Sequence, residues 1–290
     1  MHYSTVKGIL SAQNGMNLFR GCTHGCIYCD ARSACYRMDH DFEDVEVKQN
    51  APELLENALR RKRKRCMIGT GSMSDPYIPL EQNLRLTRRI MEIVYEQGFG
   101  MTVQTKSDGI LRDLDLICKI NDRAKFVVQT TLTTADETLC KKIEPNVATT
   151  AARVKMLKIM RDNGIPTVVW LSPILPFIND TTENIDAILD YCVDAGVYGI
   201  ICFGMGMTLR EGNREYFYAK LDETFNGVKA KYIRAFGNSY EVPSPNSYAL
   251  TELFNRRCDD AGILRDNSKI FKYLHEYPSG DKFEQLSFFE

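Results

Sequence analysis

Residues 21–30 read Gly-Cys-Thr-His-Gly-Cys-Ile-Tyr-Cys-Asp, a Cys-x3-Cys-x2-Cys run with cysteines at positions 22, 26 and 29. Three thiolates that lie so close in the sequence are expected to serve one metal centre. A cubane cluster of four irons normally takes four cysteine ligands. A cluster held only by Cys22, Cys26 and Cys29 keeps one iron free for a ligand that is not protein. Such an open position distinguishes a reactive metal site from a closed structural one.

Other uses of cysteine fit the chain less well. A zinc ribbon needs a second Cys-x2-Cys pair or a histidine pair downstream, but the remaining cysteines are scattered between Cys35 and Cys258. His24 lies inside the run, where a further ligand would crowd the neighbouring thiolates. A disulfide framework is not expected in a chain of 290 residues without a secretory segment.

Composition and charge are those of an ordinary globular protein, with 44% hydrophobic and 26% charged residues. No apolar run approaches the roughly 18 residues that a membrane span needs. Ten cysteines without a secretory signal indicate a reducing compartment, so we expect a cytoplasmic protein with no membrane association. The net charge of −1 gives no global attraction to nucleic acid. Six consecutive basic residues, 60–65, form either a local phosphate-contacting patch or a solvated helix end.

Short apolar runs alternate with amphipathic helical patterns along most of the chain. The apolar runs lie at residues 16–19, 66–68, 101–105, 125–130, 166–171 and 198–203. They are rich in β-branched and aromatic residues and do not alternate strictly, as expected of strands buried on both faces. Six strand–helix repeats predict an α/β fold, a partial (βα)6 TIM-like barrel. We expect residues 1–240 to form this core and residues 241–290 to form a short C-terminal helical extension and tail.

The cysteine run resembles the motif of the radical S-adenosylmethionine (SAM) superfamily, with Tyr28 at its usual aromatic position. The resemblance implies that Cys22, Cys26 and Cys29 hold a [4Fe-4S] cluster. It also implies that the amino and carboxylate groups of SAM chelate the fourth iron. One electron then cleaves SAM to a 5′-deoxyadenosyl radical, so the resemblance further implies an electron donor such as a flavodoxin or ferredoxin.

Polar side chains follow the predicted strands at the edge where such barrels carry their chemistry. We interpret the following residues as cofactor-binding: Tyr28, Ser74, Asp75, Thr105, Lys106, Ser107, Thr131 and Arg153. A planar guanidinium suits a bidentate carboxylate, so Arg153 is expected to contact the carboxylate of SAM. Caps, tight turns and surface ion pairs are the structural alternatives at each of these positions.

Further segments resemble one branch of the superfamily, the spore photoproduct lyase-like proteins. These segments are Ser-Asp-Pro-Tyr at 74–77, Thr-Lys-Ser at 105–107, Ile-Glu-Pro at 143–145 together with Arg153, and Ser-Pro-Ile-Leu-Pro at 172–176. True spore photoproduct lyases use a cysteine near the end of the second strand to return a hydrogen atom to the product radical. The corresponding residue here is Ser72, whose O–H bond is too strong to donate a hydrogen atom readily. Cys35 and Cys66 are therefore the candidate hydrogen donors, and the catalytic residues are otherwise unassigned.

The C-terminal tail contains Gln285, Leu286, Ser287, Phe288 and Phe289 in succession. This segment resembles the peptide by which bacterial DNA polymerases and repair proteins dock on the sliding clamp. A terminal peptide of this kind offers one polar and two apolar anchors to a preformed groove. The alternative is an aromatic tail that folds back onto the barrel.

Three functions are compatible with these observations. The first is a radical SAM enzyme that acts on DNA or a nucleobase lesion, as a DNA-repair-like lyase delivered to DNA by the clamp. The second is a radical SAM enzyme that modifies a peptide or a small molecule. The third is a non-enzymatic iron–sulfur protein recruited to the sliding clamp, against which the open iron argues.

Overall fold

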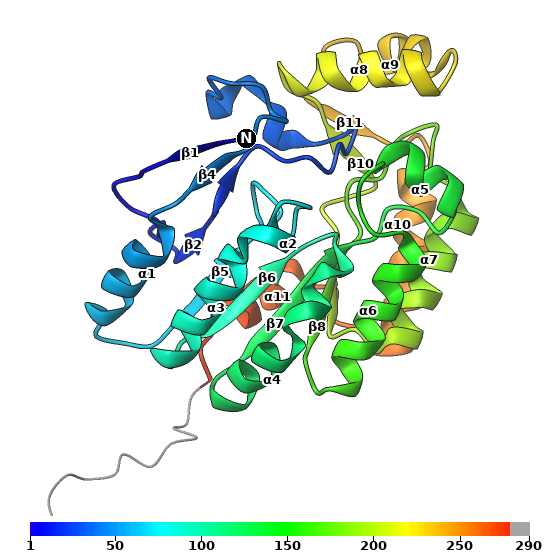
Figure 1. Cartoon of the computed structure of the whole chain (residues 1–290). Helices are drawn as coiled ribbons and strands as arrows, with labels where there is room; N and C mark the ends of the chain where they lie inside the picture. Colours follow the sequence, from blue (N-terminus) through cyan, green and yellow to red (C-terminus); the bar gives the residue numbers. More distant parts are fainter. Residues whose placement is uncertain (279–290) are drawn as a thin grey trace, which may run out of the picture.

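The centre of the computed structural model, which describes residues 1–278, is a six-stranded parallel sheet (Figure 1). Its strands are β2 Gly15–Met16, β5 Met67–Thr70, β6 Gly100–Gln104, β7 Phe126–Thr131, β8 Thr167–Trp170 and β9 Gly199–Ile201. They lie in that order, and each pairs in parallel with the next. The predicted partial (βα)6 barrel is confirmed.

Helices cover the outer face of the sheet: α1 Ala51–Arg60, α3 Leu86–Glu96, α4 Leu114–Arg123, α6 Thr150–Asp162 and α7 Thr182–Ala195. Thr149 and Thr181 cap α6 and α7, because their hydroxyls accept hydrogen bonds from main-chain N–H groups of the first turn. Gly196 ends α7 at a φ of 62°, a conformation that glycine adopts without a side-chain clash. The buried sides of these helices and of the strands form the main core.

Shorter elements connect this frame. They are the α-helices α2 Glu81–Leu84 and α5 Glu137–Ile143 and the 3-10 helices η1 Asp30–Arg32, η2 Ala34–Tyr36 and η3 Asp108–Asp113. A second sheet contains β1 His2–Ser4, β4 Glu46–Lys48 and β3 Phe19–Arg20, in that order. Strand β3 leads directly into the cysteine run, which therefore begins where the two sheets meet. No helix within residues 1–278 combines the length and the apolar character that a membrane span requires.

Between β9 and residue 278 the chain adds a pair of antiparallel strands and four helices. Strand β10 Gly206–Thr208 pairs antiparallel with β11 Glu241–Pro243, and α8 Asn213–Thr224 and α9 Val228–Phe236 lie between them in the sequence (Figure 1). The domain division expected at residue 240 falls between α9 and β11. The chain then continues into α10 Ser247–Ala261, which packs on α7, and α11 Asn267–His275.

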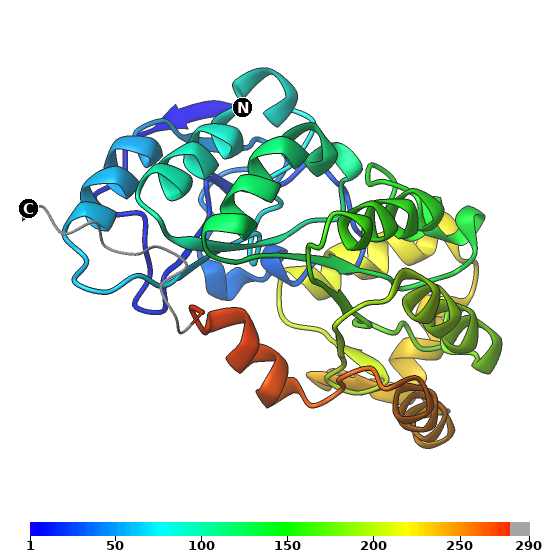
Figure 2. The ribbon, with the colours of Figure 1, turned by 90° about the horizontal axis from the view of Figure 1, so that it is seen from below.

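Helix α11 lies on the face of the sheet opposite to α1, α3 and α4 (Figure 2). Ile270 and Leu274 of this helix are buried in a cluster with Val127, Val168 and Ile201. Since side chains alternate along a strand, these three strand residues point away from the outer helices and into the barrel. Helix α11 thus fills the interior of the barrel with apolar side chains, while the carboxyl ends of the strands stay open.

Candidate active site

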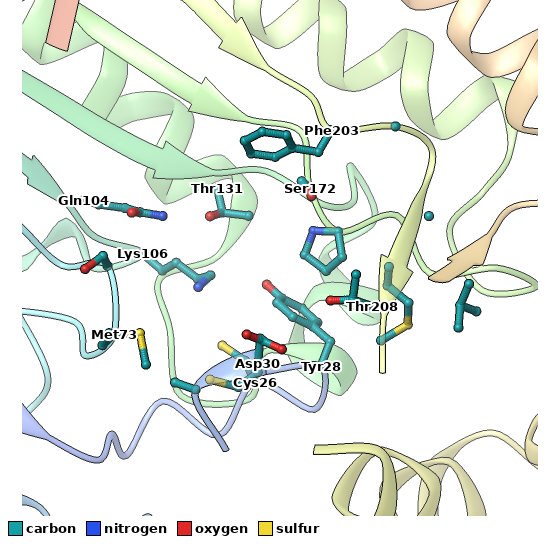
Figure 3. A pocket seen from close by; sticks show the side chains of 18 of the residues that line it. Cys26, Tyr28, Asp30, Met73, Gln104, Lys106, Thr131, Ser172, Phe203 and Thr208 are labelled. Atoms are coloured by element: carbon teal, nitrogen blue, oxygen red, sulfur yellow. The ribbon is translucent and has the colours of Figure 1, made fainter. Parts of the chain in front are cut away.

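A cavity of about 980 Å³ opens at the carboxyl ends of the strands (Figure 3). Cys22, Cys26 and Cys29 all line it. The opposite walls come from residues that end or follow successive strands: Gly71, Gln104, Thr131, Ser172 and Phe203. The cysteine run therefore lies at the mouth of the barrel, where barrels of parallel strands carry their chemistry.

The three thiols share one buried environment. Burial raises the pKa of Cys22 to about 12, and it also raises the pKa of Cys26 and Cys29. The thiolate of Cys29 would raise the pKa of both other cysteines further, so the three groups lie close together. Without a metal, the thiolate form of these cysteines is disfavoured. An iron–sulfur cluster fits the three cysteines, because bound iron stabilises the thiolate form.

Backbone contacts hold the cysteine run in place. The N–H of Cys22 donates to the carbonyl of Phe42 at 3.0 Å, and the N–H of Ile27 donates to the carbonyl of Ile143 at 3.0 Å. Gly21 has a φ of 88°, and a Cβ atom there would lie 2.4 Å from the Phe42 carbonyl oxygen. Only glycine fits this turn, which directs the chain from β3 into the cavity wall.

Asp75 joins three loops of the site. Its carboxylate accepts hydrogen bonds from Thr105 Oγ1 at 2.7 Å and from the N–H of Lys106 at 2.8 Å, and it lies 3.1 Å from His24 Nε2. Burial opposes its ionisation, but the neighbouring His24 and these hydrogen bonds lower the pKa of Asp75 to about 2. Ser74 likewise donates to a main-chain carbonyl of the cysteine run at 2.6 Å. Ser74 and Asp75 were predicted to bind the cofactor, and both line the cavity, so this role stays a prediction. Their hydrogen bonds also join the cysteine run to the loops that follow the strands.

Arg153 is fully buried and is not among the described residues that line the cavity. Its guanidinium donates to the carbonyl of Thr131 at 2.6 Å and to the carboxylate of Glu144. Glu144 also accepts from the hydroxyl of Tyr28. Burial opposes ionisation of Glu144, but the charges of Arg153 and Lys106 lower the pKa of its carboxyl. The expected contact between Arg153 and the SAM carboxylate is thus corrected: Arg153 holds Glu144, which in turn fixes the ring of Tyr28.

Among the described residues that line the cavity, Lys106 is the only lysine or arginine. Figure 3 shows its ammonium end pointing into the cavity from the end of β6. Burial disfavours its charge, but the nearby Cys26, Glu144 and Cys29 raise the pKa of Lys106 above its usual value. Its Nζ lies 5.8 Å from the centre of the Tyr28 ring. An anionic group bound in the cavity would therefore find a permanent cation beside the cysteines.

The other predicted cofactor-binding residues divide into two groups. Thr105 and Thr131 line the cavity. Ser107 is not among its described lining residues, because its hydroxyl accepts from the N–H of Gly109 at 3.1 Å and caps η3. The structural alternative, a helix cap, therefore describes Ser107.

Neither predicted hydrogen donor faces the cavity. Cys35 is exposed in η2, with its sulfur 3.4 Å from a guanidinium nitrogen of Arg210. Cys66 precedes β5, so it lies at the amino end of the sheet, opposite to the cavity. Ser72 lines the cavity, as its place after the second predicted strand indicated. Within residues 1–278, the thiols that line the cavity are those of the cysteine run.

Sequence reasoning missed the aromatic side of the cavity. Phe203, Tyr240 and Tyr248 line it with 64%, 45% and 76% of their surface exposed. Phe203 follows β9 and stacks near Phe271 of α11, with ring centres 6.1 Å apart. The aromatic residues themselves were visible in the sequence. The pairing of β10 with β11 and the position of α10, which bring these residues to one cavity, were not visible there.

A family model described as the radical SAM superfamily matches residues 16–192, more than half of the chain, and the chain belongs to this superfamily. It is 30% identical over 234 residues to an uncharacterized protein of Mycobacterium tuberculosis strain H37Rv, covering 79% of this chain and 68% of that one. A second relative, named radical SAM Nalpha-GlyT isomerase from Pseudomonas phage M6, is 24% identical over 157 residues, 54% of this chain and 32% of the phage protein.

Among solved structures, a spore photoproduct lyase complexed with a dinucleoside spore photoproduct is similar, with a TM-score of 0.62 and 12% identity. The match covers 84% of this chain and 72% of the lyase. At this identity the likeness concerns the fold. The predicted superfamily is confirmed, and the protein is a radical SAM enzyme. The predicted clamp-binding peptide, residues 285–289, lies outside the described residues and stays a prediction.

Proposed function

We propose that this protein binds a [4Fe-4S] cluster through Cys22, Cys26 and Cys29 and cleaves SAM reductively to a 5′-deoxyadenosyl radical that acts on DNA or a nucleobase lesion. The observation that carries the proposal is one cavity in which three cysteines face exposed aromatic side chains. When bound, the cluster and SAM supply the electron transfer and the radical that removes a hydrogen atom from the substrate.

In this function the residues of the chain position the reactants. Lys106 offers its ammonium to the carboxylate of SAM, and Glu144 holds Tyr28 beside the cysteines. Gln104 and Thr131 add polar groups at the ends of neighbouring strands. The volume of about 980 Å³ lies at the upper end of the range for ligand cavities, about 300–1,000 Å³, so it leaves room for a substrate beside SAM.

The aromatic rim supports a nucleobase as the substrate. Exposed aromatic side chains grouped at a cavity mark a binding surface. Stacking of a base on such a ring contributes about 1–3 kcal/mol, whatever the base. The structurally similar spore photoproduct lyase is complexed with a dinucleoside photoproduct, which agrees with this substrate class. The cavity wall within residues 1–278 lacks a thiol apart from the cysteine run, so the hydrogen-return step of those lyases is not proposed for this protein.

The direct test is SAM cleavage by anaerobic, cluster-replete protein. Incubation with SAM and dithionite should yield 5′-deoxyadenosine, and the variant Cys26→Ala, which loses a cluster ligand, should yield none. Addition of a single-stranded oligonucleotide should raise the yield, whereas an unrelated peptide should not. A cluster-replete sample that forms no 5′-deoxyadenosine would refute the proposed chemistry, and stimulation by the peptide alone would refute the substrate class.

A further inference from the structure

We infer that a second hollow, on the outer side of the cysteine run, is the docking site for a small acidic electron-carrier protein. This inference rests on the proposed function, because reductive cleavage of SAM consumes one electron from outside. During the reaction the main cavity holds SAM and substrate, so the electron has to enter by another route. The outer side of the cysteine run provides one.

The cysteine run forms a thin wall between the main cavity and the surface. Cys22 and Cys26 line the main cavity, whereas Thr23 and Ile27, which follow them directly, line a separate hollow of about 410 Å³. Gly25 lines both. At this position the wall is therefore one residue thick, and a partner seated in the hollow contacts the same backbone that carries the cluster ligands.

Hydrogen bonds from Asn146 hold this wall in place, and Gly25 leaves part of its backbone without a side chain. The N–H of Asn146 donates to the carbonyl of His24 at 3.1 Å, and its side-chain amide donates to the carbonyl of Thr23 at 2.9 Å. Gly25 has a φ of 71°, and a Cβ atom there would lie 3.1 Å from Pro145 Cγ. A side chain at position 25 would both strain the turn and fill the gap, so glycine keeps the backbone accessible.

The charges around the hollow favour an acidic partner. Lys141 and Lys142, at the end of α5, line it and are exposed, and no ion pair joins either of them to a carboxylate within residues 1–278. The two carboxylates of the wall, Glu43 and Glu223, are each paired with a basic side chain. The hollow thus presents two uncompensated positive charges next to the cysteine run. Figure 1 shows α8, which forms another wall, lying over the blue segment that contains this run.

The occupant that fits is a one-electron carrier with an acidic surface, such as a protein with a low-potential flavin or iron–sulfur group. In the step itself the carrier is oxidised by one electron and the cluster is reduced by one, and no atom is transferred. Complementary charge speeds the encounter and orients the partner. Redox complexes of this kind bury small interfaces, which agrees with docking at a small hollow.

The first experiment compares two charge-reversal pairs in the holoprotein. The double variant Lys141→Glu, Lys142→Glu reverses the charge of the two lysines that line the hollow. The control, Lys119→Glu with Lys155→Glu, makes the same change of charge on exposed faces of α4 and α6. Titration with a flavodoxin at low ionic strength should show about ten-fold weaker binding for the first pair and unchanged binding for the control. The difference should shrink as salt is added, because exposed charges are screened. Equal affinities of the two pairs would overturn the inference.

The second experiment follows cluster reduction by stopped-flow absorbance. Reduction by flavodoxin hydroquinone should be about ten-fold slower in the Lys141→Glu, Lys142→Glu protein, whereas reduction by dithionite, a small ion, should be unchanged. If wild-type protein fails to cleave SAM with dithionite, the proposed function fails. The binding titration then still decides whether the hollow is a docking surface, so the two failures are distinguishable.

Discussion

At the residue scale, Glu144 is the carboxylate on which the cysteine side of the cavity depends. It accepts from Tyr28, which is 116 residues away in the sequence, and from Arg153. The side chains of Glu144 and Arg153 are both fully buried. Removal of one partner of a buried ion pair leaves an uncompensated charge, which is costlier than removal of both.

We therefore expect Glu144→Gln to lower the free energy of unfolding by about 3 kcal/mol. Urea denaturation followed by the fluorescence of Trp170, the single tryptophan, measures this loss. The double variant Glu144→Gln, Arg153→Met removes both charges and should recover part of the stability. A single variant as stable as the wild type would show that the pair is not energetically coupled.

Lys106 gives the second prediction at this scale. If its ammonium binds the SAM carboxylate, Lys106→Met should weaken SAM binding to the cluster-replete protein about ten-fold, since a hydrogen bond to a charged group contributes about 1.5–3 kcal/mol. Equilibrium dialysis with labelled SAM is a suitable measurement. Lys106→Arg keeps the charge and should retain part of the affinity, and the exposed Lys119→Met should have no effect. Undiminished binding by Lys106→Met would assign the carboxylate to another group.

At the element scale, the strands and outer helices were predictable because each carries its own signal. Apolar β-branched runs mark strands buried on both faces, and caps and glycines mark helix ends. Parallel strands bring their carboxyl ends to one edge, so the polar residues there were predictable as a group. The individual roles of these residues were not predictable, because each role depends on partners that are distant in the sequence. Asp75, for example, accepts a hydrogen bond from Thr105, 30 residues away. The position of α11 inside the barrel was equally hidden, since its apolar face alone does not reveal which surface covers it.

The packing of α11 yields the third prediction. Ile270 is fully buried against the inner face of the sheet, so Ile270→Ala removes apolar contacts and leaves a cavity. We expect a loss of about 3 kcal/mol in the free energy of unfolding. Trp170 is a suitable probe because its ring centre lies 5.9 Å from that of Phe271 in α11. Lys269→Ala, at the exposed neighbouring position, is the control and should change stability by less than about 0.5 kcal/mol. Equal stabilities of the two variants would mean that α11 does not anchor the barrel.

At the scale of the whole molecule, the cavity and the basic run at residues 60–65 lie at opposite ends of the barrel. The run begins at the last residue of α1 and ends before β5, so it lies beside the amino ends of the strands. The end of the described chain reaches the same side, because the hydroxyl of Tyr277 donates at 3.0 Å to the carbonyl of Gly98, just before β6. A partner held at this end would leave the mouth of the cavity free. Recruitment and chemistry would then be separable.

This separation gives the last prediction, which concerns the sliding clamp. Deletion of residues 285–290 should abolish binding of the full-length protein to a bacterial sliding clamp, while cluster content and dithionite-driven SAM cleavage stay unchanged. Phe288→Ala with Phe289→Ala should weaken clamp binding more than ten-fold, since each buried aromatic anchor of an interface contributes about 2 kcal/mol or more. Glu290→Ala leaves both aromatic anchors in place and is the matched control. Surface plasmon resonance on immobilised clamp measures the binding of all three variants.

Binding that survives the deletion would locate any clamp contact elsewhere in the protein. Loss of SAM cleavage in the deletion variant would instead show that the tail supports the barrel itself.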